Sequence, residues 1–262
     1  MDKIPCSVEI LTRNSALTLE RCLESVKDLA EIIILDGNSI DKTLEIAQRY
    51  GCRIYKQYDT DEPNVAIKDY SEVRNKGLRL ASHDWFMFID SDEYLSPEAV
   101  ADIRSITTSP APRVYAFWQP RKYVLDGKVV DCAMTYPNQQ IRLFHRGWVK
   151  SFIKPVHERI ELKEGVQVGI INGFEYVPLE SLEHLKARWE RYIPLERKIY
   201  EGAHTKKLLR LIKHQTRTLV SYTIRFLRNL FFCRGYRLPW SYEWLRIKFE
   251  IRLLSLIVKE LF

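Results

Sequence analysis

Short apolar segments alternate with helical segments over the first hundred residues, and this alternation limits the possible fold more than any other feature of the chain. The apolar segments are bounded by polar residues, as buried strands are, and the helical segments carry apolar residues on one face. In chain order, we expect strand 6–12, helix 17–29, strand 31–35, helix 43–50, strand 52–55, helix 65–81 and strand 85–89. This order predicts an α/β fold whose neighbouring strands run parallel.

Polar side chains follow three of these strands at the point where each strand ends. Thr12 ends the first strand and Asn14 lies in the turn after it, Asp36 follows the second strand, and Asp90 and Asp92 follow the last. Folds of this kind bind ligands outside the carboxyl ends of their strands. We therefore expect these five side chains to contribute to one ligand site.

The run Asp90-Ser91-Asp92-Glu93 places three carboxylates directly after a buried strand. Gathering like charges there is costly unless a cation or a bound partner offsets them. Mg²⁺ and Mn²⁺ prefer oxygen ligands, and Mg²⁺ usually takes one or two carboxylates together with substrate phosphates. The run therefore predicts a site for Mg²⁺ or Mn²⁺, and the alternative is a solvated turn. For Glu93 a second interpretation is a cap of the following turn.

Beyond residue 110 the pattern changes to strand-like pieces, one long helical segment and a basic tail. The expected elements are strands 114–118, 123–125, 140–144 and 167–171 and helix 182–200. We expect a body of residues 1–204 and an amphipathic helical tail of residues 205–262.

The tail carries most of the positive charge. From residue 204 onward, 13 residues are Lys or Arg and 3 are Asp or Glu, whereas the whole chain has a net charge of +7. Basic amphipathic helices with aromatic residues suit an anionic membrane surface. The alternatives are an oligomer contact or a helical pair packed on the body. Nucleic acid is not expected as a partner, because the tail contains no recognisable nucleic-acid motif.

The five cysteines are widely spaced and form no Cys-x-x-Cys pair: Cys6, Cys22, Cys52, Cys132 and Cys233. This spacing predicts neither a zinc site nor a disulfide framework, and it favours a reducing cytosol. The N-terminus lacks the apolar core of a signal peptide, and no uncharged apolar run reaches the length of a membrane span. We therefore expect a soluble or peripheral protein.

Several motifs, in order, resemble those of the family 2 inverting glycosyltransferases with the GT-A fold. Residues 7–14 (SVEILTRN) resemble the family's first strand and nucleotide-contacting turn, and residues 31–43 (EIIILDGNSIDKT) resemble its second strand and turn. Residues 74–78 (RNKGL) resemble a helix motif, and residues 83–93 (HDWFMFIDSDE) resemble the strand with the metal-binding Asp-x-Asp motif. The pieces QIRLF at 140–144 and VHER at 156–159 resemble a subgroup similar to lipopolysaccharide-core β-glucosyltransferases.

The resemblance spans residues 5–200 and implies a Rossmann-like mixed sheet flanked by helices, extended by the basic helical tail. It implies an enzyme that moves a monosaccharide, with inversion, from a nucleotide diphosphate sugar to a lipid-linked or cell-envelope glycan. UDP-glucose is the favoured donor, and the expected location is cytoplasmic, on the inner face of the plasma membrane. The turn after residue 35 departs from the family pattern at Gly37, Asn38, Ile40 and Lys42.

The resemblance also assigns roles at the donor. Thr12, Asn14 and Asp36 are expected to hold the base and the ribose, where the alternative for Asp36 is a helix cap or turn. Asp92 is expected to ligate the metal, and Asp90 to contact the ribose or a metal-bound water. Arg74 is the expected diphosphate contact, with Lys68 as its substitute and a solvated helix surface as the alternative.

On the acceptor side, an inverting transfer needs a base for the proton of the attacking hydroxyl. Glu158 is the expected base, with His157 as its orienting neighbour or as an alternative base. Gln140 and Arg142 are expected to line the acceptor or diphosphate side, and the alternative for Arg142 is a strand salt bridge.

Two other functions compete with this interpretation. One is a non-catalytic subunit that binds sugar nucleotides or glycans in a membrane assembly. The other is a nucleotidyltransferase, which would need a Gly-rich basic loop after the first strand, and residues 12–15 do not supply one.

Overall fold

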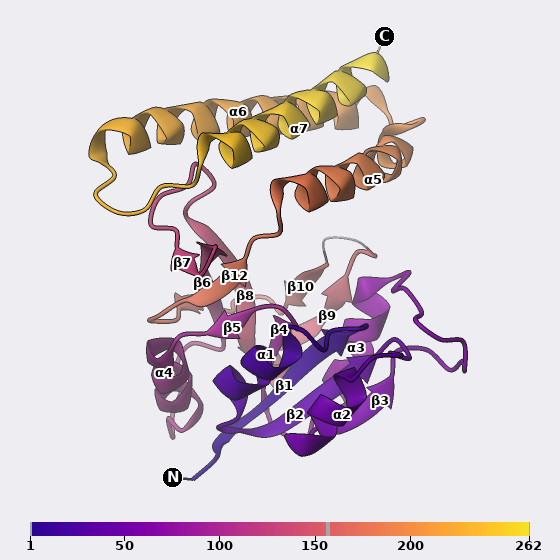
Figure 1. Cartoon of the computed structure of the whole chain (residues 1–262), viewed down its shortest axis with the longest axis vertical. Helices are drawn as coiled ribbons and strands as arrows, with labels where there is room; N and C mark the ends of the chain where they lie inside the picture. The colour runs from indigo at the N-terminus through magenta and orange to yellow at the C-terminus, as the bar shows by residue number, and fades with distance from the viewer. Residues whose placement is uncertain (1, 156–157, 262) are drawn as a thin grey trace. The chain divides into compact units, whose positions relative to one another are not determined.

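The structure is a computed structural model that describes residues 2–155 and 158–261. The chain forms two compact units (Figure 1). The first unit contains residues 1–122 and 138–177, and the second contains residues 123–137 and 178–262. The second unit thus includes a segment from the middle of the chain and begins before residue 205. The separate function of a tail from 205 to 262 stays a prediction.

A mixed sheet forms the centre of the first unit, in the strand order β3-β2-β1-β4-β8-β6-β12-β5, with β11 added beside β6. The first four strands of this order are parallel, and β8 is antiparallel to β4 and β6. The strands are β1 (Ile4–Thr12), β2 (Leu29–Asp36), β3 (Arg53–Lys56), β4 (Trp85–Asp90), β5 (Tyr94–Leu95), β6 (Ala116–Leu125), β8 (Asn138–His145), β11 (Val168–Ile170) and β12 (Glu175–Pro178). The α/β fold with parallel neighbours that the sequence predicts is therefore confirmed.

Helices cover both faces of the parallel strands (Figure 1). Alternate residues of β2 enter different cores: Ile32 and Ile34 pack in the cluster that contains α1, α2 and α4, while Ile33 and Leu35 pack in the clusters that contain α3. This alternation follows from the two-residue period of a strand. The helices are α1 (Leu19–Val26), α2 (Thr43–Arg49), α3 (Tyr70–Leu80) and α4 (Pro97–Thr107).

Two expected elements differ from the structure. Helix α3 begins at Tyr70 rather than at residue 65, because the Asp69 side chain accepts the backbone N–H of Glu72 and caps the helix there. The pieces expected at 114–118 and 123–125 join into the single strand β6. A separate two-stranded sheet, formed by β9 (Val149–Ile153) and β10 (Arg159–Leu162), follows the short 3₁₀ helix Arg146–Trp148.

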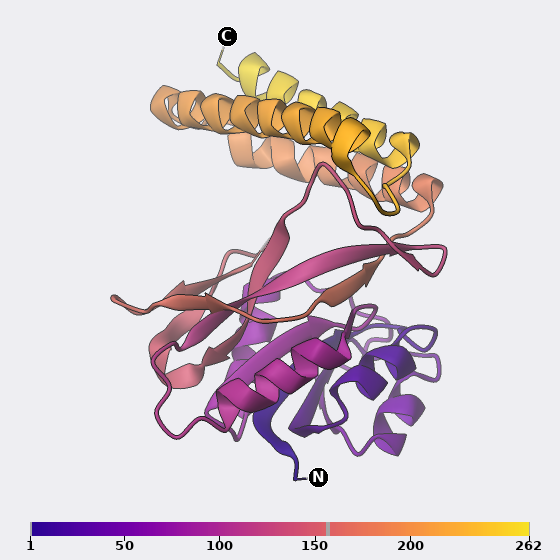
Figure 2. The same cartoon turned by 90° about the vertical axis from the view of Figure 1, so that its left-hand side faces the viewer.

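The second unit is mainly helical. It contains α5 (Leu182–Tyr200), α6 (Thr205–Phe232) and α7 (Trp240–Lys259), and the end of β6 forms a hairpin with β7 (Lys128–Val129). Helices α6 and α7 lie side by side in both views (Figures 1 and 2). The two amphipathic stretches of the basic tail are therefore helices, as predicted. Among the described residues, no helix is both long and apolar enough to cross a bilayer.

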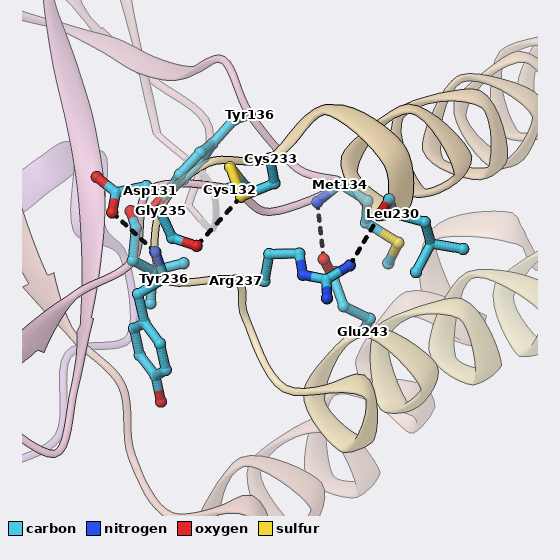
Figure 3. Close-up of a disulfide and its surroundings, with 11 residues drawn as sticks. Asp131, Cys132, Met134, Tyr136, Leu230, Cys233, Gly235, Tyr236, Arg237 and Glu243 are labelled. Carbon is cyan, nitrogen blue, oxygen red and sulfur yellow. Dashed lines mark hydrogen bonds between the residues drawn. A yellow bond between two sulfur atoms is a disulfide. The ribbon is translucent and has the colours of Figure 1, made fainter.

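A disulfide corrects one expectation from the sequence. Cys132 and Cys233, which are 101 positions apart, form a disulfide inside the second unit (Figure 3). Beside it, Asp131 Oδ2 accepts the backbone N–H of Tyr236 over 2.9 Å, so the chain segments are also joined by hydrogen bonds. The spacing of the cysteines could not show this pair, and the argument for a reducing compartment loses its basis. Cys6, Cys22 and Cys52 are free thiols.

Candidate active site

Thr12, Asn14 and Asp36 lie together at the carboxyl ends of β1 and β2. The Thr12 hydroxyl donates to Asp36 Oδ1 over 2.7 Å, and Asp36 Oδ2 accepts the backbone N–H of Ser39 over 2.7 Å. The backbone N–H of Asn14 donates to the Ser39 hydroxyl over 2.8 Å, and Asn14 Oδ1 accepts the backbone N–H of Ile40 over 2.9 Å. The two turns therefore hold each other, and the structure brings these three predicted residues together.

The turn after β2 is packed so closely that position 37 requires glycine. A Cβ atom on Gly37 would lie 2.5 Å from the carbonyl oxygen of Val65 and 3.0 Å from Gln57 Oε1. Gln57 is buried, and its amide nitrogen donates to the carbonyl oxygens of Thr12 and Leu35. Gly37 is one of the departures from the family pattern, and close backbone contact is its physical reason.

Asp90 lies between two buried arginines at the end of β4. Its Oδ1 accepts from Arg74 Nη2 over 2.6 Å, and its Oδ2 accepts from Arg142 Nη2 over 3.1 Å. Each guanidinium carbon lies 4.6 Å from the centre of the Phe88 ring, so the ring packs against both cations. Burial raises the pKa of Asp90, but the charges of Arg142 and Arg74 outweigh burial and hold this pKa well below its usual range. Asp90 is therefore ionised at neutral pH.

Arg142 reaches the cluster from a β-bulge in β8. Phe117 pairs with Leu143 and Trp118 pairs with Ile141, so Arg142 is the extra residue between the two pairs. A bulge turns a side chain away from the direction that regular alternation would give it. The Arg142 side chain is only 1% exposed, so it is not a surface residue, and it forms ion pairs from the strand, as the alternative interpretation expected.

A second arginine, Arg121, shares two acids with Arg142. Arg142 Nη2 donates to Glu93 Oε2 over 2.7 Å and to Glu175 Oε1 over 3.1 Å. Arg121 Nε donates to the same Glu175 oxygen over 2.9 Å, and Arg121 also pairs with Glu93. The interpretation of Glu93 as a turn cap is therefore wrong, since Glu93 is buried among cations. The following helix α4 is capped by Ser96 instead.

Glu9, in the middle of β1, is a fully buried acid beside Arg74. Its Oε2 lies 3.6 Å from Arg74 Nη1, and neither carboxyl oxygen has a hydrogen-bond partner among the described residues. Burial raises the pKa of Glu9 to about 8, although the charge of Arg74 lowers it in part. Burial also raises the pKa of Glu93, and the neighbouring Glu175 adds to this rise.

Three arginines and five acids form one partly buried network. Burial favours the protonated form of Glu9 and of Glu93, which lowers the excess of negative charge and so limits the cost of burying these groups together. The other acids are Asp90, Glu158 and Glu175, and the cations are Arg74, Arg121 and Arg142.

Glu158, the predicted base, contacts Arg74, with 3.4 Å between Arg74 Nε and Glu158 Oε1. Helix α3 also fixes the strand that precedes Glu158: Asn75 Nδ2 donates to the carbonyl oxygen of Phe152 over 2.9 Å, and the Phe152 N–H donates to Asn75 Oδ1 over 2.8 Å. One helix therefore orients both Asp90 and Glu158. His157, the predicted neighbour of the base, lies outside the described residues.

Asp92 and Gln140 are exposed. Asp92 follows Asp90 in the turn after β4, whereas Gln140 pairs with Gln119 across β8 and β6. Within the described ranges, no hydrogen bond or ion pair joins the Gln140 side chain to the other predicted site residues. The structure thus brings Thr12, Asn14 and Asp36 together as one group and joins Arg74, Asp90, Arg142 and Glu158 as another.

The carboxylates of Asp90 and Asp92 fit a divalent cation that also binds phosphate. Asp90 is ionised and 42% exposed, and Asp92 is exposed two residues later. Across residues 2–155 and 158–261, no group of three or more His, Cys, Asp and Glu side chains is placed to hold a metal by itself. Mg²⁺ commonly takes one or two carboxylates and completes its shell with phosphates and water, so this donor set fits it.

Sequence reasoning missed four members of this site. Glu9 left a signal, because it is an acid inside an otherwise apolar strand, and a buried acid requires a partner. Asn75 was visible only as part of a helix motif. The sequence contains no signal for Arg121 or Glu175, because both lie outside the expected strands and far from the strand ends that predict the site.

Residues 7–120 match the sequence model of glycosyl transferase family 2. Over this part the chain is similar to the family 2 glycosyltransferases. The matched residues include Thr12, Asn14, Asp36, Arg74 and Asp90, so the similarity covers most of the expected donor side of the site.

Two curated relatives are similar to more than half of the chain. An uncharacterised glycosyltransferase of Rickettsia bellii is 24% identical over 209 residues, which cover 78% of this chain and 67% of that protein. A TPR repeat-containing protein of Synechococcus elongatus is 32% identical over 156 residues, which cover 59% of this chain and 35% of that protein. The chain thus spans about a third of the length of the latter relative.

A solved structure resembles the whole chain in fold. TarS of S. aureus, residues 1–349, crystallised in complex with UDP-GlcNAc, aligns with a TM-score of 0.50 and 16% sequence identity. The alignment covers 95% of this chain and 80% of that chain. At this identity the likeness shows the fold alone and carries no information on the ligand.

Proposed function

We propose that the chain transfers a monosaccharide from a nucleotide diphosphate sugar, with inversion, to a glycan acceptor. The observation that carries this proposal is the link through Arg74, which contacts both Asp90 at the donor end and Glu158, the candidate base. The match of residues 7–120 to the family 2 model supports the reaction class. A hexose is the expected sugar, and UDP-glucose is the donor that we favour.

In this proposal the turns after β1 and β2 hold the nucleoside. Thr12, Asn14 and Asp36 present hydroxyl, amide and carboxylate groups, which match the hydrogen-bonding groups of a base and a ribose. Arg74 was expected to contact the diphosphate, and Arg142 was expected to line the acceptor or diphosphate side. Because both guanidinium groups are buried against carboxylates, we assign them the task of fixing the orientation of Asp90.

Asp90 and Asp92 would hold Mg²⁺ or Mn²⁺ together with the donor phosphates. When bound, such a cation supplies positive charge that offsets the charge of the leaving diphosphate. Arg142 and Arg74 contribute by keeping Asp90 ionised, as its lowered pKa indicates.

Glu158 would act as the general base. The oxygen of the acceptor hydroxyl forms a bond with the anomeric carbon, the bond from that carbon to the diphosphate breaks, and the hydroxyl proton moves to Glu158. The contact with Arg74 orients this carboxylate. His157 stays an orienting neighbour or an alternative base.

For the acceptor we propose a lipid-linked or cell-envelope glycan, as in lipopolysaccharide biosynthesis. Gln140 is then a candidate contact on the acceptor side. Such an acceptor would keep the protein at an anionic membrane surface, and we propose a peripheral cytoplasmic location on the inner face of the plasma membrane. This location rests on the proposed donor and acceptor, since the Cys132–Cys233 disulfide gives no support for a reducing compartment. The basic helices of the second unit support this association.

A mutational test of donor turnover separates an enzyme from a binding subunit. We expect Asp92→Asn and Glu158→Gln each to lower sugar transfer, or hydrolysis of a UDP sugar, by about 100-fold or more. EDTA should lower the activity of the unmodified chain, and added Mg²⁺ or Mn²⁺ should restore it. A panel of UDP sugars identifies the donor.

Matched controls replace exposed acids elsewhere in the first unit. Asp61→Asn and Glu164→Gln should keep full activity, because both side chains lie on the surface. Thermal stabilisation by UDP should persist in Glu158→Gln, since a ligand bound only by the folded state raises its stability. Donor binding without turnover in the unmodified chain would favour the non-catalytic subunit, and transfer that survives both site variants would refute the mechanism.

A further inference from the structure

Helix α6 carries charge of one sign only. Seven of its residues are Lys or Arg, and none of its 28 residues is Asp or Glu. Such a helix repels itself in isolation, because like charges fall on neighbouring turns. Its charge therefore calls for an anionic partner, either inside the protein or outside it.

The acids of α7 do not meet this need. Glu250 is 4% exposed and accepts from Gln215, on the inner side of α6, and from Arg246 on its own helix. Glu243 is 3% exposed and accepts the backbone N–H of Met134. These two acids are thus turned into the second unit and contact other groups there.

The opposite side of α6 presents a mixed basic and apolar surface, which we call the outer face. Val220 and Ile224 are 54% and 60% exposed at its centre. None of its basic side chains forms an ion pair within the part of the chain that the structure describes. The outer face consists of Lys213, Arg217, Val220, Ile224, Arg225 and Arg228, which lie along one side of the helix.

We propose that the outer face of α6 binds anionic phospholipid headgroups and places Val220 and Ile224 at the boundary between headgroups and acyl chains. The argument is charge complementarity combined with exposed apolar residues between the cations. Each Lys or Arg near an anionic bilayer favours binding, and apolar side chains add to binding by leaving water. A nucleic-acid surface would use the cations but leave Val220 and Ile224 in water.

This inference deepens the membrane association in the proposed function and assigns it to one face of one helix. It is independent of the transfer reaction, because the face binds lipid without donor or acceptor. A chain that binds vesicles and transfers no sugar would refute the proposed function alone. A chain that transfers sugar to a soluble acceptor and ignores vesicles would refute this inference alone.

The test is co-sedimentation of the full chain with vesicles of phosphatidylcholine alone or of phosphatidylcholine and phosphatidylglycerol in equal parts. We expect binding to the anionic vesicles only, falling as salt is added. Arg217→Glu combined with Arg228→Glu should weaken that binding by about 100-fold or more, because each reversal replaces an attraction with a repulsion. Val220→Ser combined with Ile224→Ser should weaken it by about tenfold with the charge unchanged.

The matched control reverses two exposed lysines of the first unit, Lys42→Glu with Lys163→Glu, which changes the net charge equally. The binding of this variant to anionic vesicles should fall by about threefold or less, because salt screens the interaction between distant charges and the vesicle surface. Circular dichroism confirms that every variant keeps its helices.

Four outcomes would overturn the proposal. The first three are equal binding to both vesicle types, an equal loss of binding in the lysine control, and unchanged binding after the two serine substitutions. The fourth is self-association or oligonucleotide binding that depends on Arg217 and Arg228 in a chain that does not bind vesicles.

Discussion

Asp90 is a partly exposed carboxylate whose ionised form and orientation are both stabilised by its neighbours. Arg74 and Arg142 reach it from a helix and from a bulged strand, and the Phe88 ring packs against both guanidinium groups. Removing one member would leave a buried charge without its partner, which typically costs more than the pair contributes. We infer that these arginines matter through the orientation of Asp90.

Glu9 makes the stability of the protein depend on pH. Its pKa is about 8 in the folded chain and near 4.5 when the chain is unfolded. Folding therefore favours the protonated form, so this contribution is fully present below about pH 4.5 and is lost as the pH rises towards 8. Across that range the free energy of unfolding falls by up to about 1.4 kcal/mol per pH unit.

We predict that Glu9→Gln removes much of this loss, because the amide stays neutral at every pH. In urea denaturation, the variant and the unmodified chain should have similar stability near about pH 5, and the variant should be the more stable at about pH 8.5. Glu45→Gln, at an exposed position on α2, is the control and should leave the pH profile unchanged. Parallel pH profiles for Glu9→Gln and the unmodified chain would show that Glu9 is not a buried, protonated acid.

The site residues differ in how far the sequence predicts them. Thr12, Asp36 and Asp90 were predictable, because each follows an apolar run and strand ends form ligand sites in α/β folds. The burial of Arg74 was not, since an arginine on a helix is usually a surface residue. It depends on acids that come from β1 and β4, which only the tertiary structure brings to the helix.

At the scale of elements, α3 approaches β1 closely at a single glycine. A Cβ atom on Gly77 would lie 2.5 Å from the carboxyl carbon of Glu9. Gly77 is helical and buried, so alanine would otherwise be favoured there by about 1 kcal/mol. The glycine therefore makes room for the acid beneath Arg74.

We predict that the cost of Gly77→Ala depends on Glu9. In the unmodified chain it should lower the free energy of unfolding by about 1–3 kcal/mol, as overpacking does. In a Glu9→Ala background the cost should vanish or become a small gain, because the clash is gone and the helix propensity of alanine remains. A double-mutant cycle in urea measures this coupling, and additive effects would contradict it.

The elements that the sequence predicts best are the regular ones. The apolar runs at β1, β2 and β4 predict buried strands and no other element. The start of α3, in contrast, depends on the cap at Asp69 and not on the periodicity that extends to residue 65. The bulge at Arg142 was not predictable either. It adds one residue to β8, and no local signal marks such an insertion.

For the whole molecule, the division into two units does not follow the order of the sequence. Residues 123–137 belong with the helices α5 to α7, and the disulfide in that unit joins Cys132 and Cys233, which are 101 positions apart in the sequence. Spacing alone could not reveal this pair, because nothing between the cysteines indicates that the two segments meet.

We predict that Cys132→Ser destabilises the second unit without affecting the first. A cross-link over a loop of this length typically contributes about 2–4 kcal/mol, chiefly by restricting the unfolded chain. Hydrogen exchange of the oxidised protein should therefore quicken in residues 123–137 and 205–259 of the variant and stay unchanged in β1, β2 and β4. A reducing agent should give the unmodified chain the same pattern and leave the variant unaffected.

The matched control is Cys52→Ser, which removes a free thiol of the first unit. Equal exchange in oxidised and reduced protein would mean that the disulfide does not stabilise the second unit.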